Sequence, residues 1–256
     1  MNKKFTILTS SYNSASYLKD WSESILEQSY RPLEVVFVND KSTDNTKSII
    51  DGIGKKMISN GIEVKILHNK KQLFCSSSYK VALKNATGEY FGVLDSDDML
   101  KKHACKYIAT LYDNNPDITW IYTQFQIYNH RMISQKKGIS NCPPTGVSML
   151  DWGEIPKHAF SHWRTFSDRL PDRDSIFQEG LKCAVDKYMG YRLEELGKGM
   201  FTDRICYKYR QRISNSLTTN VKGGARSTWK EVVQEALIRR QEQGIKPYPI
   251  EIYKED

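Results

Sequence analysis

The sequence predicts an α/β fold in which a mostly parallel sheet is flanked by helices. Short apolar runs alternate with amphipathic stretches from residue 4 to residue 94, which is the pattern of βαβ units. The run at 33–38 is apolar almost throughout, as expected of a buried strand. The length of 256 residues suits one substantial core with at most a small appended lobe.

The elements follow in order from their periodicity. Strands are predicted at 5–8, 33–38, 62–67 and 90–94. The helices between them are indicated by apolar residues at helical spacing, namely Leu18, Trp21 and Ile25, then Ile49, Ile50, Ile53 and Met57, then the stretch at about 76–86. Three crossovers therefore join four strands that we expect to be largely parallel.

The composition limits the classes of partner and location that the chain could have, but leaves several open. The formal charge of +8 suits an anionic partner, which leaves a nucleotide diphosphate, an acidic membrane surface and a nucleic acid open. No run approaches the roughly 20 apolar residues that span a bilayer, and the apolar stretch near the N-terminus is too short for a secretory signal, so we expect a cytoplasmic protein. The five cysteines form no Cys-x-x-Cys pair and are expected to be reduced.

Polar residues follow each predicted strand, where open α/β sheets bind their ligands. The candidate contacts with a nucleotide sugar at this edge are Thr9, Ser10, Tyr12, Asp40, Asn69, Asp95 and Ser96. The alternative for each residue is an ordinary turn or helix cap, as for Ser42.

A divalent metal is expected at this edge. The chain has neither a Gly-x-Gly-x-x-Gly after its first strand nor a Gly-x-x-x-x-Gly-Lys-[Ser/Thr], so neither backbone cradle for phosphate is available. A diphosphate then needs a cation held by oxygen ligands. Asp95 and Asp97 would lie on one side of an extended segment, where their oxygens suit Mn²⁺ or Mg²⁺.

These segments resemble glycosyltransferase family 2, a group of inverting enzymes with the GT-A (Rossmann-like) fold. The resemblance covers the first 115 residues well and is carried by Leu8-Thr-Ser-Ser-Tyr-Asn13, Val36-Phe-Val-Asn-Asp-Lys-Ser-Thr-Asp44, Ala86-Thr-Gly-Glu-Tyr90 and Leu94-Asp-Ser-Asp-Asp98. It implies that Thr9, Tyr12 and Asp40 bind the base and ribose. It also implies that Asp95 supports the ribose and metal and that Asp97 binds the metal.

The chain departs from the family pattern at several positions. Asn39 and Lys41 stand where the family often has Asp and Gly, and Ser78-Tyr79-Lys80 replaces a frequent Ala-Arg-Asn. Lys80 could contact a phosphate, with an exposed helix lysine as the alternative. Arg212 and Ser214 occupy the place where the family often has His and Ser, so no histidine metal ligand is expected there.

Asp186 is the candidate catalytic base. Transfer with inversion needs a base for the acceptor hydroxyl, and a carboxylate is the usual choice. The resemblance of the segment 185–197 to the family's Glu-Asp-x-Asp-Leu-x-x-Arg pattern selects Asp186, which also lies at the border of a predicted apolar helix face ended by Gly197. The alternative is a solvated helix aspartate.

Two further segments each have a functional and a structural interpretation. His162, Trp163 and Arg164 are candidate acceptor contacts because rings stack on sugars and Arg holds anions, whereas the alternative is a core Trp with a capping His. The helix expected within 226–243 either docks on the domain or lies on an anionic membrane.

We therefore expect a catalytic domain at 1–220, with a nucleotide-sugar-binding half at 1–115 and an acceptor-side half at 116–220, and a helical tail at 221–256. The expected reaction moves a sugar from a nucleotide diphosphate, most simply UDP, to a glycan, lipid-linked or other hydroxyl acceptor, with peripheral contact at the inner face of a membrane left open and no nucleic acid. The alternatives are a sugar nucleotidyltransferase, which would want a glycine-rich basic loop after its first strand, and a non-catalytic nucleotide- or polysaccharide-binding protein on the same scaffold.

Overall fold

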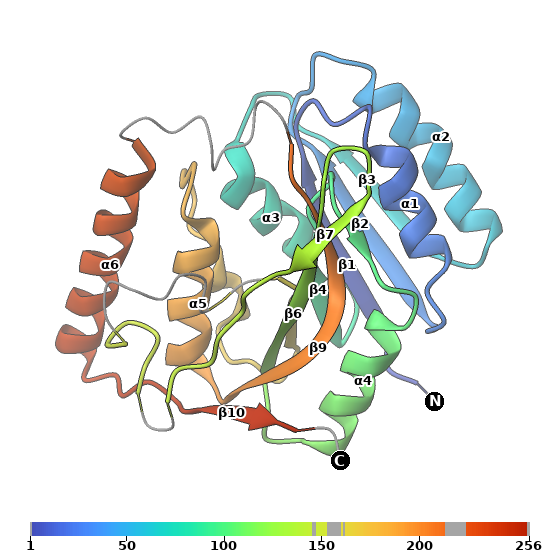
Figure 1. The fold of residues 1–256 in the computed structure, drawn as a ribbon. Coiled ribbons are helices and arrows are strands. Elements are labelled where there is room, and N and C mark those ends of the chain that lie inside the picture. Colours follow the sequence, from blue (N-terminus) through green and yellow to red (C-terminus); the bar gives the residue numbers. More distant parts are fainter. Residues whose placement is uncertain (1, 145–146, 153–159, 161, 213–223, 255–256) are drawn as a thin grey trace.

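The computed structural model describes residues 2–144, 147–152, 160, 162–212 and 224–254. Its strands form one mixed sheet, and its helices pack against that sheet (Figure 1). The strands are β1 (Phe5–Ser11), β2 (Leu33–Asn39), β3 (Glu63–His68), β4 (Tyr90–Val93), β5 (Met99–Leu100), β6 (Trp120–Tyr128), β7 (Ser134–Lys137), β8 (Arg164–Ser167), β9 (Gly199–Arg210) and β10 (Ile250–Tyr253). The helices are α1 (Leu18–Leu26), α2 (Thr46–Ser59), α3 (Phe74–Asn85), α4 (Ala104–Asn114), the 3₁₀ turn η1 (Arg173–Ile176), α5 (Val185–Leu196) and α6 (Gly224–Gln243).

The parallel half of the sheet confirms the prediction. β1 pairs in parallel with β2 on one side and with β4 on the other, and β2 pairs in parallel with β3. All seven residues of β2 are buried, as a strand covered on both faces requires. The carboxyl ends of these strands therefore meet at one edge.

The other half of the sheet is mixed. The strand order is β10-β9-β6-β8-β4-β1-β2-β3, with β5 paired to β9 and β7 paired to β6. β8 runs antiparallel to both β4 and β6, whereas β6 and β10 are parallel to β9. Because β8 lies directly beside β4, the residues at its start reach the loop that follows β4.

Helices cover both faces and divide the core into two clusters. One cluster contains Trp21 and other buried side chains of α1, α2 and α4, packed against residues such as Val35 of β2. The second cluster contains Tyr79 and other buried side chains of α3, α5 and α6, packed against Val36. Alternate residues of a strand thus pack against helices on opposite faces of the sheet, as in an α/β fold.

Helix α6 docks on α5 (Figure 1). Val232 and Ala236 are buried at this contact. Arg239 and Arg240 extend it with ion pairs to Glu195, at 2.7 and 3.0 Å. The segment that we expected to be a helical tail also contributes β10 after α6. Among the described helices, none combines the length and apolar character needed to span a bilayer.

Candidate active site

The loop after β4 places three carboxylates at the carboxyl edge of the sheet. Asp95 accepts a 2.6 Å hydrogen bond from the hydroxyl of Tyr79 in α3. Its other oxygen lies 3.5 Å from Nη2 of Arg164, the first residue of β8. Two elements remote in sequence therefore orient this carboxylate.

Asp98 is almost fully buried, with 1% of its surface exposed. The hydroxyl of Tyr207 and the backbone N–H of Arg210, both in β9, donate hydrogen bonds of 2.8 and 2.7 Å to it. Burial raises the pKa of Asp98 well above its usual range, and the charges of Asp97 and Asp95 reinforce this effect. The long strand β9 thus anchors the loop that carries Asp95, Asp97 and Asp98, which we call the acidic loop.

Asp97 is paired with an arginine. Nε of Arg212 lies 2.5 Å from Oδ2 of Asp97, and its guanidinium also lies over the ring of Tyr17 at 4.6 Å from the centroid. In this arrangement the carboxylate of Asp97 is paired with the guanidinium of Arg212.

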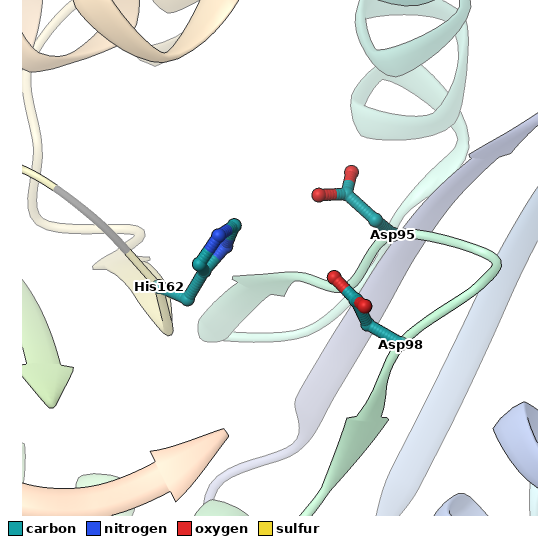
Figure 2. Close-up of side chains that lie close together, drawn as sticks. All are labelled: Asp95, Asp98 and His162. Carbon is teal, nitrogen blue, oxygen red and sulfur yellow. The ribbon is translucent and has the colours of Figure 1, made fainter. Parts of the chain in front are cut away.

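Three ligand atoms suited to a metal come together at this loop. Carboxylate oxygens of Asp95 and Asp98 and a ring nitrogen of His162 all lie within 4.8 Å of one another. Figure 2 shows these three side chains facing one another across the end of the sheet. Oxygen and imidazole ligands fit Mn²⁺, and oxygen ligands also fit Mg²⁺. The sequence led us to expect Asp95 and Asp97 as the pair, whereas the structure groups Asp95 with Asp98 and His162.

His162 is held by stacking. Its ring lies between those of Tyr207 and Tyr209, with centroids 4.6 and 5.1 Å away and nearly parallel planes. Both tyrosines belong to β9, so the strand that anchors Asp98 also sets the histidine. We expected His162 on the acceptor side, and the structure places one of its ring nitrogens within 4.8 Å of carboxylate oxygens of Asp95 and Asp98.

Residues expected to grip the nucleoside have mixed surroundings. Thr9 is buried and its hydroxyl donates to the carbonyl of Leu94 at 2.8 Å, and the buried hydroxyls of Ser96 and Ser14 lie 2.8 Å apart. These contacts fix the acidic loop against β1 and the segment that follows it. Ser10 is half-buried, and Tyr12 exposes 45% of its surface, which leaves its ring open to a ligand.

Asp40 binds the protein backbone. Its carboxylate accepts hydrogen bonds of 2.8 Å from the amide of Asn69 and from the backbone N–H groups of Leu73 and Phe74. Phe74 has a positive φ of 65°, which costs a residue with a side chain energy and is typical of functional sites. These hydrogen bonds tie Asp40 to the start of α3, and its expected contact with the base and ribose stays a prediction.

Lys80 forms a surface ion pair. Its Nζ lies 3.1 Å from Oε1 of Glu179, so the structure gives the lysine a partner other than a phosphate. Ser78, in the same helix, is buried and lies 3.1 Å from the amide of Asn69.

Arg164 interacts electrostatically with both the acidic loop and Asp186. Burial alone lowers the pKa of Arg164, but the charges of Asp95 and then Asp186 more than offset this, so the pKa is raised. Asp186 is half-buried in the first turn of α5. The charges of both carboxylates therefore act on one buried guanidinium.

Trp163 belongs to the core. Its side chain is fully buried and stacks on Phe5, with centroids 6.0 Å apart and planes at 9°. A ring without exposed surface cannot stack on a sugar, so we no longer assign Trp163 to the acceptor. This outcome agrees with the alternative of a core tryptophan.

The comparisons with known proteins identify the class and then the family. The fold is that of GT-A glycosyltransferases, as its similarity to solved members shows. The sequence profile of glycosyl transferase family 2 matches residues 6–166, which is more than half of the chain. The chain belongs to glycosyl transferase family 2.

Several relatives are polysaccharide synthases by name. The chain is 29% identical to the hyaluronan synthase of Pasteurella multocida over 254 residues, which cover 95% of this chain and 24% of that protein. It is 27% identical to the chondroitin synthase of Escherichia coli over 251 residues, which cover 95% of this chain and 33% of that protein. The chain thus spans about a quarter of the length of the first relative and a third of that of the second.

Two solved structures share the fold at lower identity. Residues 1–349 of S. aureus TarS in complex with UDP-GlcNAc superpose with a TM-score of 0.66 and 21% identity, covering 93% of this chain and 73% of that one. The mannosyltransferase PcManGT from Pyrobaculum calidifontis, in complex with GDP-Man and Mn²⁺, gives a TM-score of 0.58 and 17% identity, covering 95% and 64%.

Proposed function

We propose that this chain catalyses the inverting transfer of a sugar from a nucleotide diphosphate sugar, with UDP as the first carrier to test, to a hydroxyl group of a glycan. The observation that carries the proposal is the cluster of Asp95, Asp98 and His162 at the carboxyl edge of the parallel strands. Family membership and the UDP-GlcNAc complex of the TarS neighbour support it.

The residues divide into a donor side and an acceptor side. Asp95, Asp98 and His162 would hold a divalent ion, which when bound stabilises the negative charge of the departing diphosphate. Asp97 would be a further carboxylate for this ion once it leaves Arg212, its partner in the structure. Tyr12 offers an open aromatic surface to the base.

Asp186 is proposed as the base of a single displacement. The acceptor oxygen forms a bond to the anomeric carbon while the bond between that carbon and the diphosphate oxygen breaks. The hydroxyl proton passes to the carboxylate of Asp186, and the electron pair of the broken bond leaves with the diphosphate. Arg164 pairs with Asp95 and is also stabilised by the charge of Asp186, and its fixed charge suits both the donor phosphates and an acidic acceptor.

The acceptor is proposed as a polysaccharide because two relatives are named as hyaluronan and chondroitin synthases. A lipid-linked acceptor at the inner face of a membrane is the second candidate in the same assay. A cytoplasmic location belongs to this proposal, because the chain would work where its nucleotide-activated donor is available.

A turnover assay tests the proposal. UDP-glucose, UDP-GlcNAc, UDP-glucuronic acid and GDP-mannose are each incubated with Mn²⁺ and with oligosaccharide or lipid-linked acceptors, and release of the nucleoside diphosphate is measured. Wild-type protein should turn over one donor, and NMR should show an inverted anomeric configuration in the product. Asp186→Asn should lose on the order of 1,000-fold in kcat while keeping its donor affinity. Asp174→Asn, an exposed aspartate of η1, should behave as wild type. Wild-type turnover in Asp186→Asn would remove Asp186 from this role.

A further inference from the structure

The three carboxylates of the acidic loop already have partners within the chain. Asp95 has Tyr79 and Arg164, Asp98 has Tyr207 and a backbone N–H of β9, and Asp97 has Arg212. A divalent ion that binds here must therefore compete with groups of the protein. Because Arg212 is the partner that carries a full charge at 2.5 Å, its pairing with Asp97 is the strongest of these competitors.

Arg212 is built to hold this position without being locked in it. Its side chain is 18% exposed and that of Asp97 is 19% exposed, so both groups stay within reach of a ligand. The guanidinium lies over the ring of Tyr17, and Arg210, whose guanidinium lies over the same ring, donates from Nε to the backbone carbonyl of Asp97 at 2.9 Å. Arg210 also pairs with Asp20 at 2.6 Å, so it is already neutralised, whereas Arg212 has Asp97 as its carboxylate in the described structure.

We propose that Arg212 is an internal counter-cation that withholds Asp97 from the metal until a nucleotide diphosphate draws the guanidinium away. The inference rests on the proposed function. A guanidinium binds phosphate oxygens in a bidentate manner, so the diphosphate offers Arg212 a replacement for the carboxylate. Release of Asp97 then adds an oxygen ligand for the ion. Metal and nucleotide consequently bind cooperatively, and each raises the affinity of the other by the same factor.

Mn²⁺ affinity measured without turnover tests this inference. Free Mn²⁺ is followed by electron paramagnetic resonance with and without saturating UDP, and GDP serves as a second nucleotide. We expect wild-type protein to bind Mn²⁺ at least 30-fold more tightly when the nucleotide is present. Arg212→Gln should bind Mn²⁺ about 10-fold more tightly than wild type without nucleotide, and its cooperativity should fall below about threefold.

Two variants serve as controls. Arg212→Lys keeps the charge and should stay within about threefold of wild type in Mn²⁺ affinity without nucleotide. Arg131→Gln removes an exposed arginine of the β6–β7 turn and should change neither value. Thermal unfolding verifies that each variant is folded.

The outcomes separate the inference from the function on which it rests. A folded Arg212→Gln variant could bind both ligands with the Mn²⁺ affinity and the cooperativity of wild type. That result would overturn the role of Arg212 and leave the proposed function intact. Absence of both Mn²⁺ and nucleotide binding in wild-type protein would overturn the proposed function, and the inference with it.

Discussion

The hydroxyl of Tyr79 donates a 2.6 Å hydrogen bond to Oδ1 of Asp95 and so joins helix α3 to the acidic loop. The tyrosine ring is buried and stacks on Phe177 at 5.3 Å between centroids, which fixes the direction of the hydroxyl. This contact lies in the helix segment where the sequence departs from the family pattern. The departure from the family pattern therefore supplies a support for a carboxylate of the candidate metal site.

Tyr79→Phe should weaken donor binding. A hydrogen bond to a charged group contributes about 1.5–3 kcal/mol, and without it the Asp95 carboxylate loses a fixed orientation. We expect calorimetry to show UDP binding in the presence of Mn²⁺ weakened by about 10-fold, which corresponds to roughly 1.4 kcal/mol. Tyr30→Phe is the matched control, because Tyr30 is also buried and donates to the carbonyl of Lys3 at 2.6 Å near the opposite end of the strands. Equal binding by Tyr79→Phe and wild type would contradict the supporting role.

Arg164→Gln should impair both the donor site and the reaction. Removal of the buried Arg164 cation leaves the Asp95 carboxylate without its ion-pair partner at the candidate donor site. We expect kcat/KM to fall by on the order of 100-fold, and Arg164→Lys to recover part of it.

Arg169→Gln provides the comparison for Arg164. Arg169 follows β8, and its guanidinium donates to the carbonyls of Tyr112 and Ile118. This variant should lose stability in thermal unfolding but keep the wild-type kcat. An Arg164→Gln variant that only lost stability in the same way would show that Arg164 has no part in the reaction.

Stability should depend on the titration of Glu194. Burial raises its pKa from 4.5 to about 7, an effect that the N–H of Met149 and the charge of Arg240 oppose and that Asp151 reinforces. The folded state holds the proton more tightly than the unfolded state, so the stabilisation is fully present below pH 4.5 and is lost as the pH rises through about 7. Relative to Glu194→Gln, the wild-type free energy of unfolding should fall by about 1–3 kcal/mol across this window.

Glu195 provides a control of opposite sign. Burial would raise its pKa, but the hydrogen bond and charge of Arg239, with Arg192 and Arg240, lower it. Its stabilisation is therefore present above the unfolded pKa and lost as the pH falls. Denaturant unfolding at several pH values should show slopes of opposite sign for the two glutamates, and equal slopes would contradict the assignment.

Two glycine substitutions should change stability in opposite directions. Gly52 is exposed within α2, where an added Cβ meets nothing within 4 Å, so Gly52→Ala should stabilise the fold by about 0.5–1 kcal/mol. A Cβ at Gly92 would lie 2.4 Å from the buried ring of Trp163, so Gly92→Ala should destabilise by about 1–3 kcal/mol. Denaturant titration measures both, and a neutral Gly92→Ala would show that the ring can move aside.

The parallel half of the fold could be predicted because its signals are local. The run at 33–38 is apolar throughout most of its length, and the structure places β2 there, buried at all seven residues. The order of β6, β8, β9 and β10 has no comparable signal, because it depends on pairing between segments far apart in the sequence. The start of β8 beside the acidic loop was therefore not foreseen.

Of the candidate site, the part that depends on local sequence could be predicted. The acidic loop is a local motif, and Asp95 is one of the three residues whose ligand atoms are grouped closely enough to hold a metal ion. His162 reaches this cluster through stacking on Tyr207 and Tyr209, which no spacing between residues 95 and 162 reveals. Tyr207 and Tyr209 lie two residues apart, and on a strand this spacing indicates a shared face.

Nucleotide binding tests the central claim most directly. UDP, GDP, TDP and CDP are titrated by calorimetry into wild-type protein and into Asp95→Ala, with and without Mn²⁺, and Asp174→Ala serves as a control at an exposed aspartate. We predict that wild type and Asp174→Ala bind one of the four nucleotides in a manner that requires Mn²⁺, and that Asp95→Ala does not. Failure of all four nucleotides to bind folded wild-type protein, or Mn²⁺-dependent binding that survives in Asp95→Ala, would contradict a donor site at the acidic loop.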